Sequence, residues 1–182
     1  GQEGAKGILS GDLVVVKRSE ANRRWIRLDE NTIAVNLESS PGLPFSGAKV
    51  ELHVGIGGAI YQKREDGLYR NGRKVVLHLS KRQMNGKSMR GYELCDELTG
   101  KPVLNANELD ALYDNPHLIP EDWKRDEKGN IRFIFFWGTI YRGPGTDGLC
   151  VRCLYFNDGT WCRHHYWLVN DWYGNNPAAL AS

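Results

Sequence analysis

The sequence LCVRCLYFNDGTWCRHHYWL at residues 149–168 predicts a β-hairpin. Both halves of this stretch are rich in aromatic and β-branched residues, which favour strands. Asp158-Gly159 between them is typical of a two-residue turn, because the central residues of such a turn take positive φ. This turn places Cys153 opposite His164 and assigns each neighbouring side chain to one of the two faces of the hairpin.

One face of this hairpin carries cysteine and histidine side chains that could hold a metal ion. Cys153, Cys162 and His164 share this face, whereas Cys150 and His165 lie on the other. Because zinc needs four ligands around one centre, a regular hairpin supplies too few, and buried packing is the preferred interpretation of the cysteines. We therefore expect no cofactor. A small metal- or cysteine-dependent hydrolase that uses Cys153, Cys162 and His164 stays an alternative.

The opposite face carries aromatic rings between cationic side chains. Aromatic planes stack on bases or sugars, while guanidinium groups reach phosphates. The alternative is that this heavier aromatic side packs into the core. Exposure of Trp161 and Trp167 discriminates between the two. The candidate ligand-binding residues on this face are Trp161, Arg163, His165 and Trp167.

Upstream of the hairpin, residues 12–79 have the pattern of short strands separated by polar turns. Asn71-Gly72 between two β-prone runs favours a second hairpin with a type I′ turn. The other predicted strands are DLVVVKR (12–18), RWIRL (24–28), TIAVNL (32–37), AKVELHV (48–54) and AIYQKR (59–64).

Residues 80–124 have helical character. A first helix is expected over residues 88–98, with Ser88 as its cap. A second helix begins at Asn105, because Glu108 three residues later completes a capping box. One more short turn is expected at residues 120–123.

Strands return over residues 131–172, with Gly138 at a bend or bulge, and residues 173–182 are expected to form a tail. The order of β, α and β segments predicts an α+β fold. We expect one domain over residues 1–182, built as a mainly antiparallel β-sheet or half-barrel with two to three short helices between the β-rich halves.

The composition excludes several classes of protein. With 182 residues, 41% of them hydrophobic, the chain can bury a core without disulfides or structural metals. No apolar run reaches the roughly 18 residues of a membrane span, so no membrane partner is expected. The 4 cysteines and the absence of an export signal are typical of a reducing compartment, so we expect a cytoplasmic protein.

The charge is unevenly distributed along the chain. The net charge is +2, but residues 1–90 carry 16 Lys and Arg against 9 Asp and Glu, and residues 91–182 carry 8 against 13. Such an excess attracts phosphate or an acidic partner, unless the basic half neutralises the acidic half where they pack together. The excess is concentrated in nine cations: Lys63, Arg64, Arg70, Arg73, Lys74, Lys81, Arg82, Lys87 and Arg90.

Two glycine-containing segments fail as phosphate-binding motifs. Gly86-Lys87-Ser88 resembles the end of a phosphate loop, but Lys81 stands where the first glycine is required. The segment at residues 55–60 lacks the third glycine of a dinucleotide-binding fingerprint. No other catalytic motif is present, so an enzyme is not the preferred interpretation.

Much of the chain beyond Asp66 is similar to one family of proteins. It resembles a set of short uncharacterised bacterial proteins, chiefly from candidate phyla. This resemblance implies a bacterial origin and one compact unit, and it implies no activity or ligand. The residues that carry it are DGLYRNGRKVVLHLSKRQ (66–83), GKPVLNANELDALYDNPHLIPEDWK (100–124), FFWGTIYR (135–142) and WLVNDWYGNNPAALAS (167–182).

The sequence therefore predicts a non-catalytic binding module for nucleic acid or another polyanion. The basic region from Lys63 to Arg90 is its expected contact surface, with stacking by the hairpin aromatics. The alternatives are the hydrolase described above and a protein–protein interaction or assembly module, whose oligomeric state the sequence leaves open.

Overall fold

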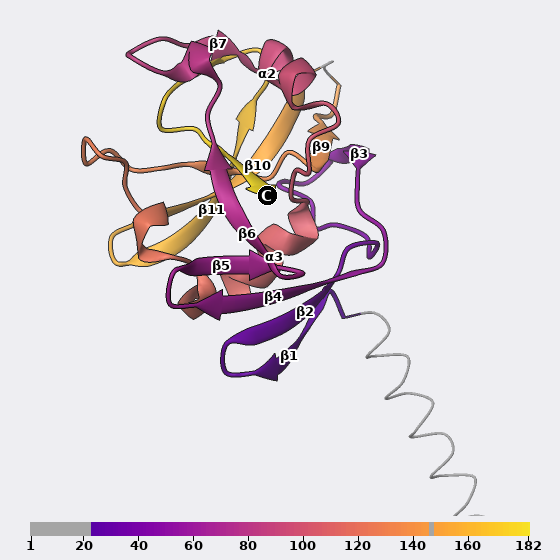
Figure 1. The fold of residues 1–182 in the computed structure, drawn as a ribbon. Helices are drawn as coiled ribbons and strands as arrows, with labels where there is room; N and C mark the ends of the chain where they lie inside the picture. The colour runs from indigo at the N-terminus through magenta and orange to yellow at the C-terminus, as the bar shows by residue number, and fades with distance from the viewer. Residues whose placement is uncertain (1–22, 146–147) are drawn as a thin grey trace, which may run out of the picture.

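The computed structural model describes residues 23–145 and 148–182 (Figure 1). The strand predicted at residues 12–18 lies outside this part of the chain. The described residues form mostly β-strands, with the two α-helices α2 (Gly91–Leu98) and α3 (Ala106–Asp114). Within those ranges, no helix has the length and apolarity needed to cross a bilayer.

Eleven strands of the described chain join in one sheet, ordered β1-β2-β4-β5-β6-β13-β8-β10-β9-β3, with β11 paired to β10. A separate small sheet pairs β12 with β7. The strands are β1 (Trp25–Asp29), β2 (Thr32–Asn36), β3 (Lys49–His53), β4 (Gly58–Arg64), β5 (Gly67–Arg70), β6 (Arg73–His78), β7 (Met89–Arg90), β8 (Ile134–Phe135), β9 (Thr139–Arg142), β10 (Leu149–Asn157), β11 (Thr160–Trp167), β12 (Asp171–Trp172) and β13 (Ala178–Ala181).

This architecture confirms an α+β fold with a mainly antiparallel sheet. The large sheet is nevertheless mixed, because β13 runs parallel to β8 where Ala178 pairs with Phe135. The eleven described strands do not make a clear half-barrel. The α-helices and the 3₁₀ helices η1 (Lys81–Gln83), η2 (Pro116–Leu118) and η3 (Glu121–Trp123) lie between the two β-rich segments of the chain, as predicted.

The last residues of the chain differ from the expected tail. Strand β13 pairs antiparallel with β6 over four residues and is buried along its whole length. Alanine is somewhat depleted in strands, so the Ala-Ala-Leu-Ala pattern of β13 gives little local signal. It lies between β6 and β8, so pairing with strands far away in the sequence places it.

Both predicted tight turns are present. Asp158 and Gly159 have φ values of 50° and 78°, and Cys153 pairs with His164 in the β10–β11 register. Asn71 and Gly72 have φ values of 49° and 77°. These positive angles are those that the type I′ turn requires.

Helix α2 begins later than predicted. Its N-cap is Arg90, and Ser88 lies before it. Met89 and Arg90 are extended because they pair with Trp172 and Asp171 of β12. This contact with a strand far along the chain delays the first helical turn, and no local pattern shows it.

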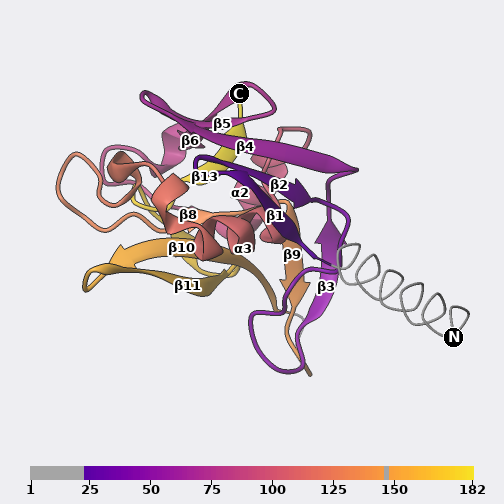
Figure 2. The ribbon, with the colours of Figure 1, turned by 90° about the horizontal axis from the view of Figure 1, so that it is seen from below.

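Helix α3 lies inside the molecule between two layers of strands. Figure 2 shows it between the β1–β2 side and the β10–β11 hairpin. Leu109 and Leu112 pack in one core cluster with Ile33 of β2 and Leu154 of β10. Burial on both sides fixes the position of the helix, and with it the polar side chains that α3 directs toward the hairpin.

Gly138 lies at a close approach of two backbones. It connects β8 to β9, its N–H donates to Leu104 O at 2.8 Å, and its carbonyl oxygen accepts from Val54 N at 2.8 Å. A Cβ added at Gly138 would lie 2.8 Å from backbone atoms of Leu104. Gly138 therefore has no room for a side chain, because the segment that leads into α3 passes too close to it.

Candidate functional site

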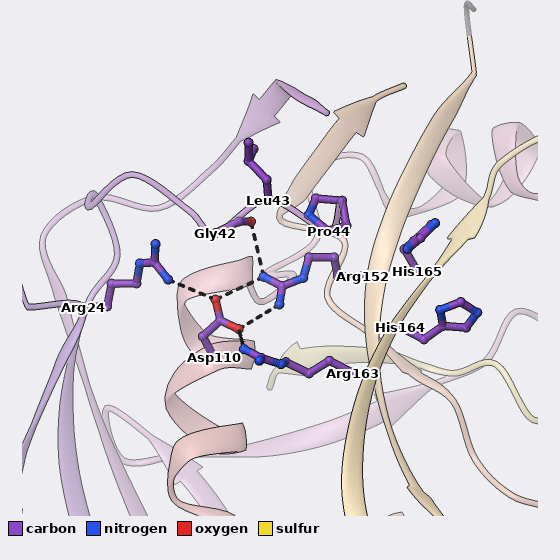
Figure 3. A pocket seen from close by; sticks show the side chains of 9 residues that line it. All are labelled: Arg24, Gly42, Leu43, Pro44, Asp110, Arg152, Arg163, His164 and His165. Carbon is purple, nitrogen blue, oxygen red and sulfur yellow. Dashed lines mark hydrogen bonds and ion pairs between the residues drawn. The ribbon is translucent and has the colours of Figure 1, made fainter. Parts of the chain in front are cut away.

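The site is built on the N-terminal half of α3, whose start is fixed by its cap. Asn105 Oδ1 accepts from Asn107 N at 3.0 Å and from Glu108 N at 3.2 Å. Glu108 Oε2 accepts from Asn105 N at 2.6 Å, which completes the predicted capping box. Asp110 follows in the next turn of the helix and faces the β10–β11 hairpin (Figure 3).

Three arginines, one just before β1 and two on the β10–β11 hairpin, bind the carboxylate of Asp110 (Figure 3). Arg152 of β10 donates to both oxygens, from Nη2 to Oδ1 at 2.8 Å and from Nη1 to Oδ2 at 3.1 Å. Arg163 of β11 donates to Oδ1 at 2.9 Å, and Arg24 donates to Oδ2 at 3.4 Å. We call these four residues the arginine cluster.

The three arginines differ strongly in burial. The side chain of Arg152 is 7% exposed, and that of its partner Asp110 is 6% exposed. By contrast, the side chains of Arg24 and Arg163 are 41% and 40% exposed. Arg152 is therefore the buried partner of Asp110, whereas Arg24 and Arg163 still face solvent.

The charge of the cluster is strongly positive. Burial acts to raise the pKa of Asp110, but the hydrogen bonds and charges of Arg152 and Arg163 outweigh it and hold this pKa below its usual value. Asp110 therefore stays ionised at neutral pH and cancels one of the three positive charges. A net charge of about +2 remains beside an open pocket.

This pocket has a volume of about 360 Å³ (Figure 3). We call it the small pocket. The arginine cluster forms part of its wall, and the remaining lining residues are Gly42, Leu43, Pro44, His164 and His165.

A second pocket adjoins the first. Arg24, Asp110 and Arg163 also line this large pocket, which has a volume of about 770 Å³. Arg23 and Arg27 bring the arginines that line the two pockets to five, against the two aspartates Asp110 and Asp114. The remaining lining residues of the large pocket are Trp25, Ile26 and Asp114.

His165 lies between the small pocket and an aromatic cluster. Its ring is 4.9 Å from that of Phe45 and 5.7 Å from that of Trp167, measured between ring centroids. Burial, and then the charges of His164 and Arg152, lower the pKa of His165 below 6.5. The imidazole is therefore mainly neutral at pH 7.

The hairpin residues predicted to bind a ligand fall into two groups. Arg163 and His165 line the small pocket. Trp161 is 8% exposed and packs in the core against Phe156, while Trp167 is half-buried against Phe45. The Trp161 ring is therefore engaged in core packing, and the Trp167 ring is only partly accessible.

Sequence reasoning missed Arg24, Asp110 and Arg152 as site residues. Two of them carry a local signal in hindsight, because each is a charge between apolar neighbours: Asp110 between Leu109 and Ala111, and Arg152 within LCVRCL. A charge at such a position is expected to be paired. Arg24 carries no such signal.

Three cations of the predicted Lys63–Arg90 surface pair with carboxylates from the second half of the chain. Arg70 Nε lies 2.6 Å from Glu108 Oε1 in a largely buried pair. Arg82 pairs with Glu93 at 3.0 Å, and Arg90 pairs with Asp171 at 3.4 Å. These contacts neutralise part of the basic region.

The other six cations of that region have no carboxylate within ion-pair distance in the part of the chain that the structure describes. Lys63 Nζ donates to His117 O at 2.9 Å, and the guanidinium of Arg64 lies 4.1 Å above the ring of Tyr69. The exposed remainder are Arg73, Lys74, Lys81 and Lys87.

The cysteine and histidine face of the hairpin is arranged as its register predicts. Cys153 opposes His164, and Cys162 opposes Tyr155. The Cys153 thiol is buried, and burial raises its pKa to about 12. In residues 23–145 and 148–182 no three His, Cys, Asp or Glu side chains are placed to hold a metal ion together. The four cysteines are free thiols.

Comparison of the chain with protein-family models, with curated proteins and with solved structures gave no match. The site is therefore interpreted from its own geometry.

Proposed function

We propose that this protein is a non-catalytic binding module for a polyanion, and that its ligand is nucleic acid. The arginine cluster and the two pockets beside it are the contact surface. We place the protein in the cytoplasm, where its four free thiols would persist.

One observation carries this proposal: Asp110 holds three arginines together and cancels only one of their three charges. Arginine presents several N–H donors in a planar fork that matches phosphate oxygens. Arg24 and Arg163 each use one donor on Asp110 and remain two fifths exposed, so the rest of each fork is available to a ligand.

The two adjoining pockets favour a ligand with several phosphates. Arg23 and Arg27 extend the positive surface from the arginine cluster along the large pocket. A ligand with one charge would leave these arginines unused, whereas a phosphate backbone reaches successive cations. Binding to a backbone also needs no catalytic group.

The experiment is a titration of the protein onto a fluorescent single-stranded oligonucleotide, followed by anisotropy over a series of salt concentrations. We expect affinity at low salt that falls steeply as salt rises. The double variant Arg24→Ala/Arg163→Ala should reduce the slope of log affinity against log salt by roughly 1.4, the value for two single-strand phosphate contacts.

Lys101→Ala is a single-charge control for this experiment, because Lys101 is exposed and lies outside both pockets. It should bind as the wild type does. Absence of binding by the wild-type protein at low salt would reject the proposed function.

The unpaired cations of the Lys63–Arg90 region form a second candidate surface for the same ligand. Lys63 and Arg64 of β4 and Arg73 and Lys74 of β6 lie on strands joined through β5. They contribute a positive field but no pocket, so we propose that they attract the ligand over a longer range.

An assembly function is the second candidate, and a row of apolar side chains favours it. Ile26 of β1 pairs with Ala34 of β2, which pairs with Ile60 of β4. Ile26 and Ile60 are 42% and 43% exposed. Exposed apolar rows of this kind occur at protein interfaces. Light scattering over a concentration series tests this candidate, and a monomer at all concentrations would exclude self-assembly.

A further inference from the structure

We propose that the small pocket binds a terminal phosphate, a phosphomonoester at the end of a nucleic acid strand, with Arg24 and Arg163 as its principal contacts. This inference rests on the proposed function and narrows it to one kind of ligand group. It follows from the donors, the charge and the shape of the small pocket.

The donors are held in place before a ligand arrives. Among the described residues, Arg24 and Arg163 each make one side-chain hydrogen bond, and both bonds go to Asp110. The guanidinium of Arg163 also lies 3.9 Å above the ring of Tyr113. Because Asp110 itself is fixed by the buried Arg152, a phosphate would meet oriented donors and little side-chain entropy would be lost.

The charge of the pocket matches a monoester better than an internal diester. A phosphomonoester carries close to −2 at pH 7, whereas each internal phosphate of a nucleic acid carries −1. The arginine cluster has about two positive charges left after Asp110 is counted. A bound dianion would therefore neutralise the cluster, and a diester would leave it positive.

The shape of the site favours the end of a strand. The small pocket and the large pocket meet at Arg24, Asp110 and Arg163. The other sides of the small pocket are formed by the segment 42–44 and by the hairpin residues His164 and His165 (Figure 3). A terminal phosphate in the small pocket needs one path for its chain, and the adjoining large pocket provides it.

His165 supplies a further donor on this wall. Its ring forms no hydrogen bond with another described residue, so its N–H group is unused within that part of the chain. A neutral imidazole still offers one N–H donor. His165 can therefore contribute to a bound phosphate without first gaining a proton.

The test compares three oligonucleotides of one sequence: one with a 5′-phosphate, one with a 3′-phosphate and one with hydroxyl groups at both ends. Each competes with a fluorescent single strand for the wild-type protein. We expect one phosphorylated oligonucleotide to bind about tenfold more tightly than the unphosphorylated one, the effect of one or two charge-assisted hydrogen bonds. Inorganic phosphate at millimolar concentration should reduce this advantage.

Single variants identify the residues that cause the preference for the phosphorylated end. Arg163→Ala and Arg24→Ala should each remove most of the preference for the phosphorylated end, while Lys101→Ala should keep it. Circular dichroism and thermal unfolding of each variant show whether it is folded, and the exposed positions of Arg24 and Arg163 favour variants that fold.

The possible failures are distinguishable. Equal affinity for all three oligonucleotides, with the usual salt dependence, would overturn the terminal-phosphate inference and leave the proposed function intact. A preference that survives in Arg163→Ala and Arg24→Ala would also overturn it. No binding to any of the three would reject the proposed function itself.

Discussion

Asp110 shows how burial separates the roles of three arginines that share one partner. Arg152 and Asp110 are both almost fully buried, and their two hydrogen bonds satisfy each other's charge in the interior. Arg24 and Arg163 bind the same carboxylate from the solvent side. We therefore assign Arg152 to the stability of the fold and the other two to ligand binding.

This division predicts losses of stability of different size for two Arg→Ala substitutions. Arg152→Ala leaves Asp110 buried without its main partner and should lower the free energy of unfolding by about 3–5 kcal/mol. Arg163→Ala removes a partly exposed ion pair and should lower it by no more than about 1 kcal/mol. Urea unfolding measures both values. Equal losses in the two variants would contradict the assignment.

The lowered pKa of Asp110 predicts a pH dependence of stability. In the unfolded chain an aspartate titrates near pH 3.9. Because the folded-state pKa is lower, the stabilising effect is fully present above the unfolded value and is lost as the pH falls through the folded value. Urea unfolding of the wild type should therefore show lower stability with each step below about pH 4.

Asp110→Asn provides the control for this pH dependence. The variant should be less stable than the wild type at neutral pH, and its stability should fall less on acidification. An identical pH profile in the two proteins would mean that another carboxylate is responsible.

Cys153 gives a residue-scale test of the hydrolase alternative. With a pKa raised to about 12 by burial, its thiol is almost entirely protonated at pH 8, and so it is a poor nucleophile. We expect iodoacetamide to modify Cys153 only after unfolding, while the partly exposed Cys162 reacts in the folded protein. Mass spectrometry of digested samples identifies the modified residue. Rapid modification of Cys153 in the folded state would restore the alternative.

At the scale of elements, the sequence predicted the turns and the helix start that depend only on neighbouring residues. The turns at Asp158-Gly159 and Asn71-Gly72 need positive φ, and the cap of α3 needs Asn105 with Glu108, so a short window of sequence contains the whole signal. The register of the β10–β11 hairpin followed from its turn alone.

The elements that differ from expectation depend on distant contacts. The start of α2 is set by the pairing of Met89 and Arg90 with β12. Strand β13 forms because β6 and β8 leave a place for it, although its alanines give no strand signal. Gly138 was expected at a bend or bulge. The structure shows that a glycine is needed there because the backbone of Leu104 lies close beside it.

This last contact predicts a large effect at one glycine and a small effect at another. Gly138→Ala would place a Cβ 2.8 Å from backbone atoms of Leu104, so the segment before α3 must shift and stability should fall by about 2 kcal/mol or more. Gly58→Ala in β4 is the control, since its Cβ would lie at an ordinary 3.5 Å from Val35 O. Thermal unfolding of both variants provides the comparison, and equal stability of the two would contradict this reading of Gly138.

At the scale of the whole molecule, the uneven charge of the chain is partly neutralised by folding. Arg70, Arg82 and Arg90 of the basic half pair with acids of the other half. The arginine cluster instead combines Arg24 with Arg152 and Arg163. The segment at Arg24 and the β10–β11 hairpin are far apart in the sequence and meet at α3, so counting charge along the chain could not reveal this site.

The exposed apolar row on β1, β2 and β4 borders the same region, because Ile26 also lines the large pocket. A ligand that follows the large pocket would therefore lie close to this row. If the row were an interface between copies of the chain, binding and self-association would interfere with each other. Anisotropy titrations at two protein concentrations would show such interference as a change in apparent affinity.

The most direct test of the arginine cluster compares two double variants that each remove two positive charges. Arg24→Ala/Arg163→Ala changes the cluster, and Arg73→Ala/Lys74→Ala changes the exposed part of the Lys63–Arg90 region. In a titration with a single-stranded oligonucleotide at low salt, we predict a loss of affinity of about tenfold or more for the first variant and a much smaller loss for the second. Equal losses, or a larger loss for the second variant, would contradict the account.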